Sequence, residues 1–409
     1  RKDLTVRKNM FRTRVALLAL AALSASAQMA TAQVVVTKSA GDKVGIDLSG
    51  IQTGGGAAAQ VVRRTLENNL NRSGWMQVAA PGKGAVAVRG TITENGGQVL
   101  FKCQVTNVVG QSYLNAAYAQ PAALAYQAAH QAAHDIVTKV TGKPTFFLAQ
   151  LALIGKRGGS QELYLADSGA QNIRPLTQDR THCLKPRWSP DNRLISYASY
   201  LMRWPDVYTI DVKNGTRTRA AYYPGVNSGG AIAPDGRTMA LILSKDGNPE
   251  LYVKTLPNGV PIRLTRTPRA TEGSPCWSPD GSRIAYVSDV SGTPQIYIVS
   301  RTGGAPERLT MRGAQNVAPD WGANGLIAYQ TLSGGKFMIA IIDPATKQER
   351  IITPYDASFE DPSWAPDGRH IAAARAVNYN YSIYLLDTMG DKPVALTTSG
   401  DWTAPAWSR

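Results

Sequence analysis

The sequence predicts a small α/β domain followed by an all-β, six-bladed β-propeller whose ring is closed by the C-terminal strand. The first observation is that segments such as "WSPDGSRIAYVS" recur with steps of 44, 45, 44, 43 and 43 residues. A fixed period of this size is typical of solenoids, propellers and arrays. The segments are aligned on one anchor residue each: Trp188, Ile232, Trp277, Trp321, Trp364 and Trp407.

The second observation is that each repeat consists of short strand-like runs. Runs such as "DVYTID", "QIYIVS" and "ERLT" are β-branched or aromatic and are bounded by Gly, Asn, Asp and Pro, which is typical of strands. No segment of the repeat has helical length, so four strands per repeat, six times, predict a six-bladed propeller. The third observation is Ser-Pro-Asp-Gly, which suits a type I turn between antiparallel neighbours. Four aspartates belong to these turns and not to a metal or catalytic ring: Asp191, Asp235, Asp280 and Asp367.

The anchor strand is expected to be the innermost strand of its blade. A proline precedes most anchors by two residues, and proline is confined to sheet edges because it cannot donate to a ladder. These positions are Pro186, Gly230, Pro275, Pro319, Pro362 and Pro405. The first strand, expected at 146–155, has no anchor strand before it, whereas the last anchor strand has nothing after it. We therefore expect Thr403–Ser408 to pair with the strand around Gln150, which removes an exposed edge.

Upstream of the propeller, residues 33–143 are expected to form the α/β domain, with the propeller at 146–409. The segment "AAAQVVRRTLENNLNRSGW" has apolar residues one helical turn apart and Gly74 as a stop, so it predicts a helix. Two alternating runs around Asn95-Gly96-Gly97 predict a hairpin. A second helix is expected to start at Pro121 and to end at Gly142.

Residues 1–32 are expected to be a secretory signal peptide, with 1–9 as an upstream extension. Arg12 and Arg14 precede an apolar run, and Ala30-Thr31-Ala32 resembles a cleavage site. Cleavage after Ala27 is the alternative. The apolar run is too short for a transmembrane helix, so the mature chain is expected outside the cytoplasm.

Composition argues against several function classes. The formal charge is +15 and the leader carries about a third of it, but no Lys/Arg run with interleaved aromatics is present, so nucleic-acid binding is not expected. Cys103, Cys183 and Cys276 allow one disulfide at most, and buried free thiols are the simpler expectation.

Catalytic and metal signatures are also weak. His130 and His134 have zinc-site spacing, but Gln131 replaces the general-base glutamate and no third ligand is apparent; packing explains them better. His182 and His370 are isolated in sequence. A Gly-x-Ser-x-Gly nucleophile motif is missing. We expect no enzyme, no metal and no cofactor.

A binding surface remains, at the channel mouth where the loops before the six anchor strands converge. The residues six and five positions before each anchor are the candidates, because loop residues at a rigid rim commonly bind partners. Phe359 and Trp402 are the strongest candidates for a protein interface, because exposed aromatic residues are typical interface anchors. The candidates are His182, Val226, Asn227, Thr271, Glu272, Gln315, Asn316, Phe359 and Trp402.

The order of these parts resembles the TolB family, periplasmic components of the Tol-Pal system. The resemblance rests on the leader, "VVRRTLENNLNRSGW", a helix ending in "TGKP", and six "PxWSPDG…IAY…IYI…RLT" repeats that end in "PAWS". It implies a monomeric periplasmic protein that binds the peptidoglycan-associated lipoprotein Pal at the propeller mouth and supports outer-membrane invagination during cell division.

The resemblance also implies that TolA binds the N-terminal region, including a switch segment at the mature N-terminus. That segment is Gln33, Val34, Val35, Val36, Thr37 and Lys38. The chain departs from the family pattern at Ile232, at Val226-Asn227 and at Gly322-Ala323-Asn324, which puts individual Pal contacts in question. Two other function classes stay open at this stage: a secreted propeller enzyme, such as a lactonase or a peptidase accessory domain, and a glycan-binding propeller.

Overall fold

The computed structural model describes residues 43–409. The expected leader and the switch segment Gln33–Lys38 lie outside the described residues. In the described part, no helix combines the length and apolar character needed to cross a membrane.

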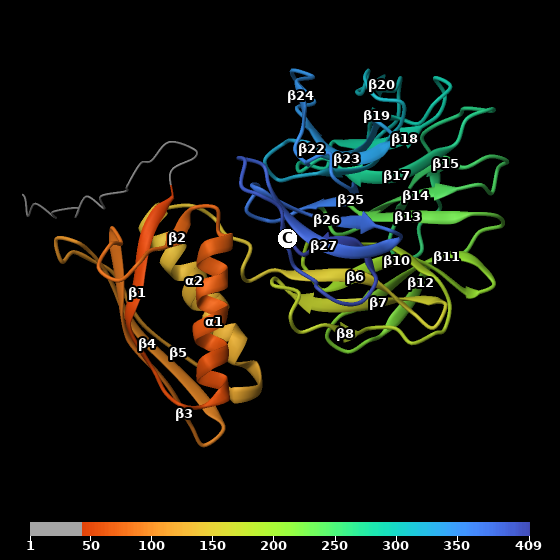
Figure 1. Ribbon diagram of the computed structural model, residues 1–409. Coiled ribbons are helices and arrows are strands. Elements are labelled where there is room, and N and C mark those ends of the chain that lie inside the picture. The colour runs from red at the N-terminus through yellow and green to blue at the C-terminus, as the bar shows by residue number, and fades with distance from the viewer. Residues whose placement is uncertain (1–42) are drawn as a thin grey trace, which may run out of the picture. The chain divides into compact units, whose positions relative to one another are not determined.

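The first part of the described chain is a five-stranded sheet with two helices (Figure 1). The strand order is β2-β1-β3-β4-β5; β1 runs parallel to β2 and β3, and β3, β4 and β5 are antiparallel neighbours. The elements are β1 (Val44–Thr53), α1 (Ala57–Arg72), β2 (Met76–Val78), β3 (Val86–Asn95), β4 (Gln98–Asn107), β5 (Ser112–Pro121), a 3₁₀ turn (Ala122–Leu124) and α2 (Ala125–Thr141).

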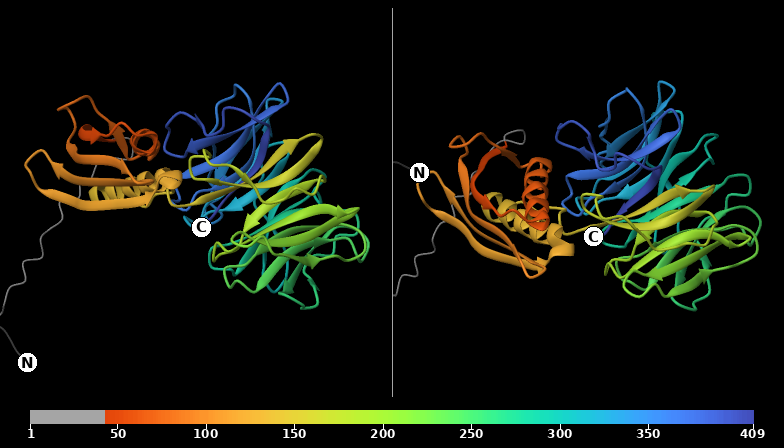
Figure 2. Two further views of the ribbon diagram at one scale, coloured as in Figure 1. Left: turned by 90° about the horizontal axis from the view of Figure 1, so that it is seen from below. Right: turned by 60° about the horizontal axis from the view of Figure 1, so that its bottom comes forward.

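Both helices pack on one face of this sheet, as the turned views of Figure 2 also show. Leu66 of α1, Phe101 of β4 and Ile136 of α2 are completely buried in a common core. The glycines that follow the helices, Gly74 and Gly142, both have positive φ, so they end the helices as expected. The expected hairpin joins β3 and β4 and is therefore confirmed.

The second part consists of six four-stranded sheets in a ring, within residues 150–407. This confirms the expected fold class. In chain order the sheets are β6 (Gln150–Arg157), β7 (Ser160–Asp167) and β8 (Arg174–Pro175), joined by β29; β9 (Cys183–Trp188), β10 (Leu194–Met202), β11 (Trp204–Asp211) and β12 (Arg217–Ala221); β13 (Asn227–Ile232), β14 (Thr238–Leu243), β15 (Glu250–Thr255) and β16 (Ile262–Arg263). They continue with β17 (Glu272–Trp277), β18 (Arg283–Ser288), β19 (Gln295–Ser300) and β20 (Glu307–Arg308); β21 (Asn316–Trp321), β22 (Ile327–Ser333), β23 (Lys336–Ile342) and β24 (Glu349–Ile351); and β25 (Ser358–Trp364), β26 (His370–Val377), β27 (Asn380–Asp387) and β28 (Val394–Ala395).

The last strand, β29 (Trp402–Trp407), closes the ring as predicted. It runs antiparallel to β6, with Thr403 opposite Ile154 and Trp407 opposite Leu151. Ser408 N donates to Gln150 O at 2.8 Å. The C-terminal segment therefore supplies the inner strand of the blade that starts at Gln150.

The Ser-Pro-Asp-Gly segments form tight turns, as expected. Gly281 N donates to Ser278 O at 2.9 Å, and Gly281 has a φ of +68°, which a residue with a side chain adopts only with strain. Asp280 Oδ1 accepts hydrogen bonds from Ser278 Oγ and Ser282 N. The carboxylate thus completes the turn.

Several elements differ from the expectations. β6 begins at Gln150 and not at Phe146, because Phe146 and Phe147 turn into a buried aromatic cluster with Trp407. The second helix begins at Ala125, because Pro121 still belongs to β5. β1, β2 and β5 were not predicted at all; the small, alanine-rich side chains of β5 carry a weak strand signal. The three cysteines are buried and free.

His370 is not isolated in space, which corrects the sequence-based view. Its Nδ1 lies 2.6 Å from Asp367 Oδ2 and its Nε2 lies 3.4 Å from Asp387 Oδ2. Burial lowers the pKa of His370, but the two carboxylates outweigh it and bring the pKa to about 9. A buried, charged His370 therefore holds β26 to β27 within the last complete blade.

Candidate functional site at the propeller mouth

The propeller has two faces, which carry different loops. We call the face where chain segments enter the inner strands the mouth face, and the face with the Ser-Pro-Asp-Gly turns the turn face. On the mouth face, six segments converge on β29, β9, β13, β17, β21 and β25. The hairpins between the second and third strands of the blades lie on the same face, because antiparallel neighbours return there.

The candidate residues at the mouth divide into two sets by their position before the anchor. Five of the six residues at the position five before the anchor are buried: Cys183, Asn227, Glu272, Asn316 and Phe359. The residues one position earlier are exposed or half-buried: His182, Val226, Thr271, Gln315, Ser358 and Asp401. Successive side chains of a strand point to opposite faces, so only the earlier position faces solvent.

The buried polar members hold their own loops in place. Asn227 Nδ2 donates to three carbonyl oxygens, those of Pro205, Tyr223 and Gly225, and its Oδ1 accepts from Tyr223 N. Asn316 Nδ2 donates to Gln295 Oε1 at 2.7 Å. The side chains of these two residues are buried and engaged in hydrogen bonds within the protein.

Phe359 is not an exposed aromatic anchor, which corrects the prediction. Its side chain is 0% exposed and packs edge-on against Tyr384 at 6.1 Å in the core beneath the loop. Trp402 is half-buried; it stacks edge-on against Tyr164 at 5.0 Å and donates from Nε1 to Ser399 O. Phe359 is buried because it packs against Ile339 and Ile341 of the neighbouring blade.

His182, Val226 and Thr271 remain accessible at the mouth. The His182 ring lies edge-on to Tyr200 at 6.4 Å, and its Nδ1 is 3.2 Å from Gln161 Oε1. Val226 is 39% exposed. The three side chains come from consecutive blades, so they form an arc along the rim.

The channel is narrow beneath this rim. Residues before the inner-strand prolines, such as Lys185, Ser274 and Asp361, have φ near +50°, which bends each strand inward at a bulge. The cavity that they line at the mouth is about 30 Å³ in volume, enough for about one water molecule, and a wider one of about 250 Å³ lies between the inner strands toward the turn face. Lower down, Arg187 Nη1 donates to Asp320 Oδ1 at 2.7 Å. β9 and β21 face each other across the ring, so this ion pair spans the channel.

One cluster below the mouth brings together groups that bind metals. Glu162, Asp179 and Cys183 have ligand atoms within 4.8 Å of one another. Each group already has a protein partner: Glu162 accepts from Thr177 Oγ1, Asp179 accepts from Arg217, and Cys183 Sγ lies 3.7 Å from Thr177 Oγ1. Burial raises the pKa of the Cys183 thiol to about 11. These contacts account for the closeness of the three groups as packing between loops.

Glu272 is the mouth residue with the most altered acidity. Burial and the neighbouring Glu250 raise the pKa of Glu272 to about 7, although hydrogen bonds from Thr267 and Ser288 oppose the shift. The unfolded carboxyl ionises near 4.5. We expect the folded state to lose up to about 3 kcal/mol of stability as pH rises from about 4.5 to about 7, because the unfolded chain releases the proton first.

Replacing Glu272 with Gln should remove this part of the pH dependence. The measurement is the free energy of unfolding by urea at several pH values. Glu307→Gln is the matched control, because Glu307 is 62% exposed at its side chain. If Glu272→Gln and the parent chain keep the same slope over this range, the acidity of Glu272 has been assigned wrongly.

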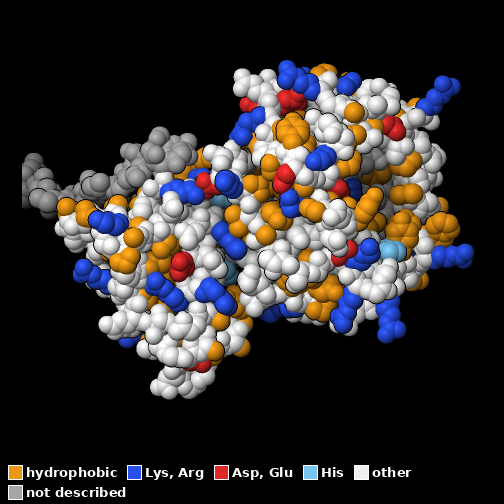
Figure 3. All heavy atoms as spheres, viewed as in Figure 1, with side chains coloured by type: hydrophobic (Ala, Val, Ile, Leu, Met, Phe, Trp, Pro, Cys, Tyr) orange, Lys and Arg blue, Asp and Glu red, His pale blue; other side chains and the backbone are white. Residues whose placement is uncertain are grey.

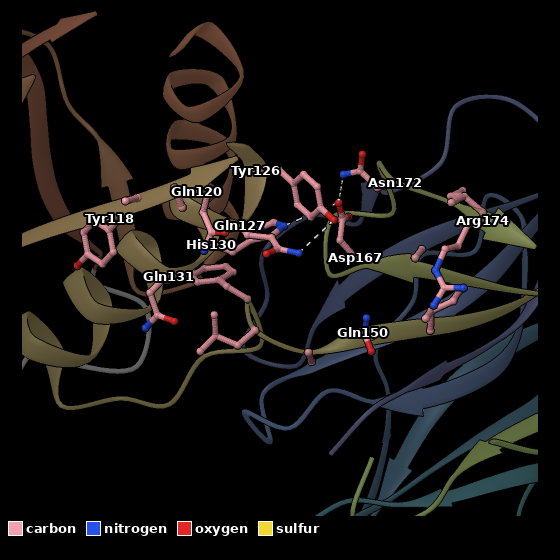
Figure 4. A pocket seen from close by; sticks show the side chains of 18 of the residues that line it. Tyr118, Gln120, Tyr126, Gln127, His130, Gln131, Gln150, Asp167, Asn172 and Arg174 are labelled. Carbon is pink, nitrogen blue, oxygen red and sulfur yellow. Dashed lines mark hydrogen bonds and ion pairs between the residues drawn. The ribbon is translucent and has the colours of Figure 1, made fainter. Parts of the chain in front are cut away.

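A second cavity, of about 750 Å³, lies between β5, α2 and β7 (Figure 4). Asp167 points into it; its Oδ2 accepts a hydrogen bond from Asn172 at 2.5 Å and lies 3.9 Å from His130 Nε2. His130 Nδ1 is hydrogen-bonded to Asn69 Nδ2, whereas His134 Nδ1 is hydrogen-bonded to Thr145 Oγ1. The two histidines thus have different partners. Sequence reasoning missed this cavity because β5 was not predicted.

Comparison with known proteins places the chain in a family. A family model described as "TolB beta propeller domain" matches residues 137–409. A crystal structure of TolB from Acinetobacter baumannii is similar with a TM-score of 0.79 and 26% identity, over 90% of this chain and 97% of that one.

Curated relatives match over shorter regions. A "Protein TolB homolog" from Chlorobaculum tepidum is 29% identical over 50% of this chain, and a "Tol-Pal system protein TolB" from Francisella tularensis subsp. tularensis is 33% identical over 34%. The matched regions span 46% and 34% of those relatives' own lengths. The family model covers two thirds of the sequence, and the structure shows a six-bladed ring that is closed by its last strand. The chain therefore belongs to the TolB β-propeller family.

Proposed function

We propose that this protein is a periplasmic, non-enzymatic component of a Tol-Pal system that binds the peptidoglycan-associated lipoprotein at the mouth face of its propeller. In this role it supports outer-membrane integrity and invagination during cell division. Family membership and the similarity to Tol-Pal system proteins support the assignment.

The main support for this proposal is the set of solvent-facing side chains around the mouth of the propeller. Side chains of consecutive blades face solvent around the mouth, where the cavity between the inner strands has a volume of only about 30 Å³, which favours docking against the rim on this face. His182, Val226 and Thr271 are the accessible members that we assign to the lipoprotein contact. Glu272, Asn227 and Asn316 support them from below, and Gln315 and Trp402 border them.

The second part of the proposal concerns TolA. We assign its binding to the N-terminal region, with the segment Gln33–Lys38 as a switch that is released or docked according to whether the lipoprotein is bound. Export by a signal peptide is part of the same proposal. These statements rest on the family resemblance.

The decisive test is the affinity of the purified chain for the lipoprotein. We expect the triple variant His182→Ala, Val226→Ser, Thr271→Ala to bind at least about tenfold more weakly, because truncating several residues of an interface removes its anchors. Binding is measured by calorimetry. The variant should melt like the parent chain, since these side chains are accessible.

The matched control is Lys213→Ala with Arg237→Ala, two exposed residues of the turn face. It should bind normally. Equal affinities for both variants would place the contact elsewhere. Phe359→Ala is unsuitable for this test, because removing a buried phenylalanine costs about 3 to 5 kcal/mol of stability.

A further inference from the structure

The hairpin between β10 and β11 has an unusually apolar tip. Tyr200, Leu201, Met202 and Trp204 are 38%, 41%, 57% and 67% exposed. The tip is a tight turn in which Arg203 N donates to Tyr200 O at 2.9 Å and Arg203 has a φ of +74°. Four exposed apolar or aromatic residues in one turn are costly for a protein surface unless they have a function.

The equivalent hairpins of the other blades show that this composition is not required by the turn. Most of them use glycine and polar residues at the tip: "RGGS" at 157–160, "SKDGNP" at 244–249, "DVSGTP" at 289–294 and "SGGK" at 333–336. The sixth, "VNYN" at 377–380, has an exposed Tyr379 but two asparagines. The connections differ in length: two residues join the strands at 158–159, 334–335 and 378–379, longer loops do so at 244–249 and 289–294, and Arg203 alone separates β10 from β11. The four exposed apolar residues of "YLMRW" are particular to this blade.

A basic pocket lies next to the apolar tip. It has a volume of about 710 Å³, and its lining includes Arg157, Arg180 and His182. One carboxylate, Glu162, also lines it; this side chain is buried and accepts hydrogen bonds from Thr177 Oγ1 and Arg180 N. Arg157, Arg180 and Arg203 are exposed, and within residues 43–409 none of them forms an ion pair with an acidic side chain. The acidic residues nearby are engaged: Asp179 with Arg217, and Asp206 with Arg219.

The pocket and the tip are one continuous surface. Tyr200 N donates to His182 O at 3.1 Å, and the rings of His182 and Tyr200 meet edge to face. Figure 3 shows hydrophobic side chains gathered beside Lys and Arg side chains on the visible face of the propeller.

We propose that this surface docks directly onto a phospholipid bilayer that contains anionic headgroups. Leu201 and Met202 enter the acyl boundary, Tyr200 and Trp204 lie at the headgroup level, and the basic pocket holds a headgroup phosphate. Aromatic rings prefer the membrane interface, and Arg203 at the tip reaches back to the phosphates with its long side chain. This surface lies on the mouth face and shares His182 with the proposed lipoprotein contact, but the membrane proposal rests on the β10–β11 tip and the arginines and does not require lipoprotein binding.

The arrangement favours a bilayer over a protein partner for two reasons. The apolar residues form a narrow protrusion, which a soft medium surrounds but a flat protein surface cannot. Moreover, an apolar tip combined with free cations provides the two signals, insertion and electrostatic attraction, that reversible membrane binding needs.

The test is sedimentation of the full chain with vesicles of phosphatidylethanolamine and phosphatidylglycerol, compared with vesicles of phosphatidylcholine alone. We expect binding to the anionic vesicles that weakens with salt. Leu201→Ser, Met202→Ser, Trp204→Ser in one chain should reduce the partition coefficient at least about tenfold, and Arg157→Gln with Arg180→Gln about tenfold. Both variants should keep the parent melting temperature.

The matched control is Val260→Ser with Ile262→Ser, which removes apolar residues that are 83% and 64% exposed near the turn face. It should bind vesicles normally. A second readout is quenching of tryptophan fluorescence by brominated lipid, which Trp204→Phe should reduce. The proposal is overturned if the parent chain does not prefer anionic vesicles. It is also overturned if the tip variant loses lipoprotein binding but still sediments with vesicles.

Discussion

Removing Trp402–Arg409 should abolish cooperative folding of the propeller, with a melting temperature at least about 15 °C lower or no transition at all. The strand β29 joins three blades at once. Trp407 lies opposite Leu151 of β6, Trp188 Nε1 donates to Ala406 O at 2.9 Å, and Trp407 N donates to Ser363 Oγ at 3.0 Å. Without the strand, β6 becomes an open edge and the ring has no closure.

Circular dichroism and calorimetric melting measure this effect. The matched control is removal of Arg409 alone, whose backbone contacts Asn192 at the surface; this should cost only about 1 kcal/mol. The point variant Trp407→Ala should lie between the two, at about 3 to 5 kcal/mol. A truncated chain that melts within a few degrees of the parent would show that the other blades hold the ring without its last strand.

Arg369→Met should destabilise the protein by about 3 to 5 kcal/mol, because it removes one of the two cationic side chains that pair with the buried carboxylate of Asp387. The Arg369 side chain is 4% exposed, and its Nε and Nη2 both donate to Asp387 Oδ2, at 2.8 and 2.7 Å. His370 and Arg369 together hold the pKa of Asp387 far below its usual range, against the opposing effect of burial. Asp387 therefore stays ionised after the substitution. Only His370 then remains to offset the cost of burying its negative charge.

Urea unfolding measures the cost, and Arg193→Met is the matched control. Arg193 is 63% exposed and its ion pairs are 3.5 to 3.6 Å long, so its loss should cost less than about 1 kcal/mol. The double variant Arg369→Met, Asp387→Asn should be more stable than Arg369→Met alone, because the unpaired charge is then gone. Equal costs for Arg369→Met and Arg193→Met would show that the buried pair is solvated.

The repeat pattern explains how much of the fold could be predicted. A constant period, proline two residues before most anchors and glycine at the turn are local features, and each one restricts the backbone by itself. The pairing of Thr403–Ser408 with Gln150 followed from counting strands. By contrast, β5 and the cavity beside it depend on pairing with β4, which the alanine-rich segment 112–121 does not signal.

The buried ion pairs could not be predicted from the sequence either. His370 stands alone in the sequence but lies between Asp367 and Asp387 in the fold. Arg187 and Asp320 are more than a hundred residues apart, yet the ring brings them together across its channel. Such pairs need the closed ring, because no local pattern brings their atoms within reach.

The sequence alone determined the number of blades, their turns, the closing strand and the six positions around the mouth. Only the tertiary structure decided which mouth residues face solvent. Neighbouring residues of a strand point to opposite sides, so His182, six positions before its anchor, is exposed, while Phe359, five positions before its anchor, is buried in the core. Side-chain direction is set by packing between blades, and that packing exists only once the ring is complete.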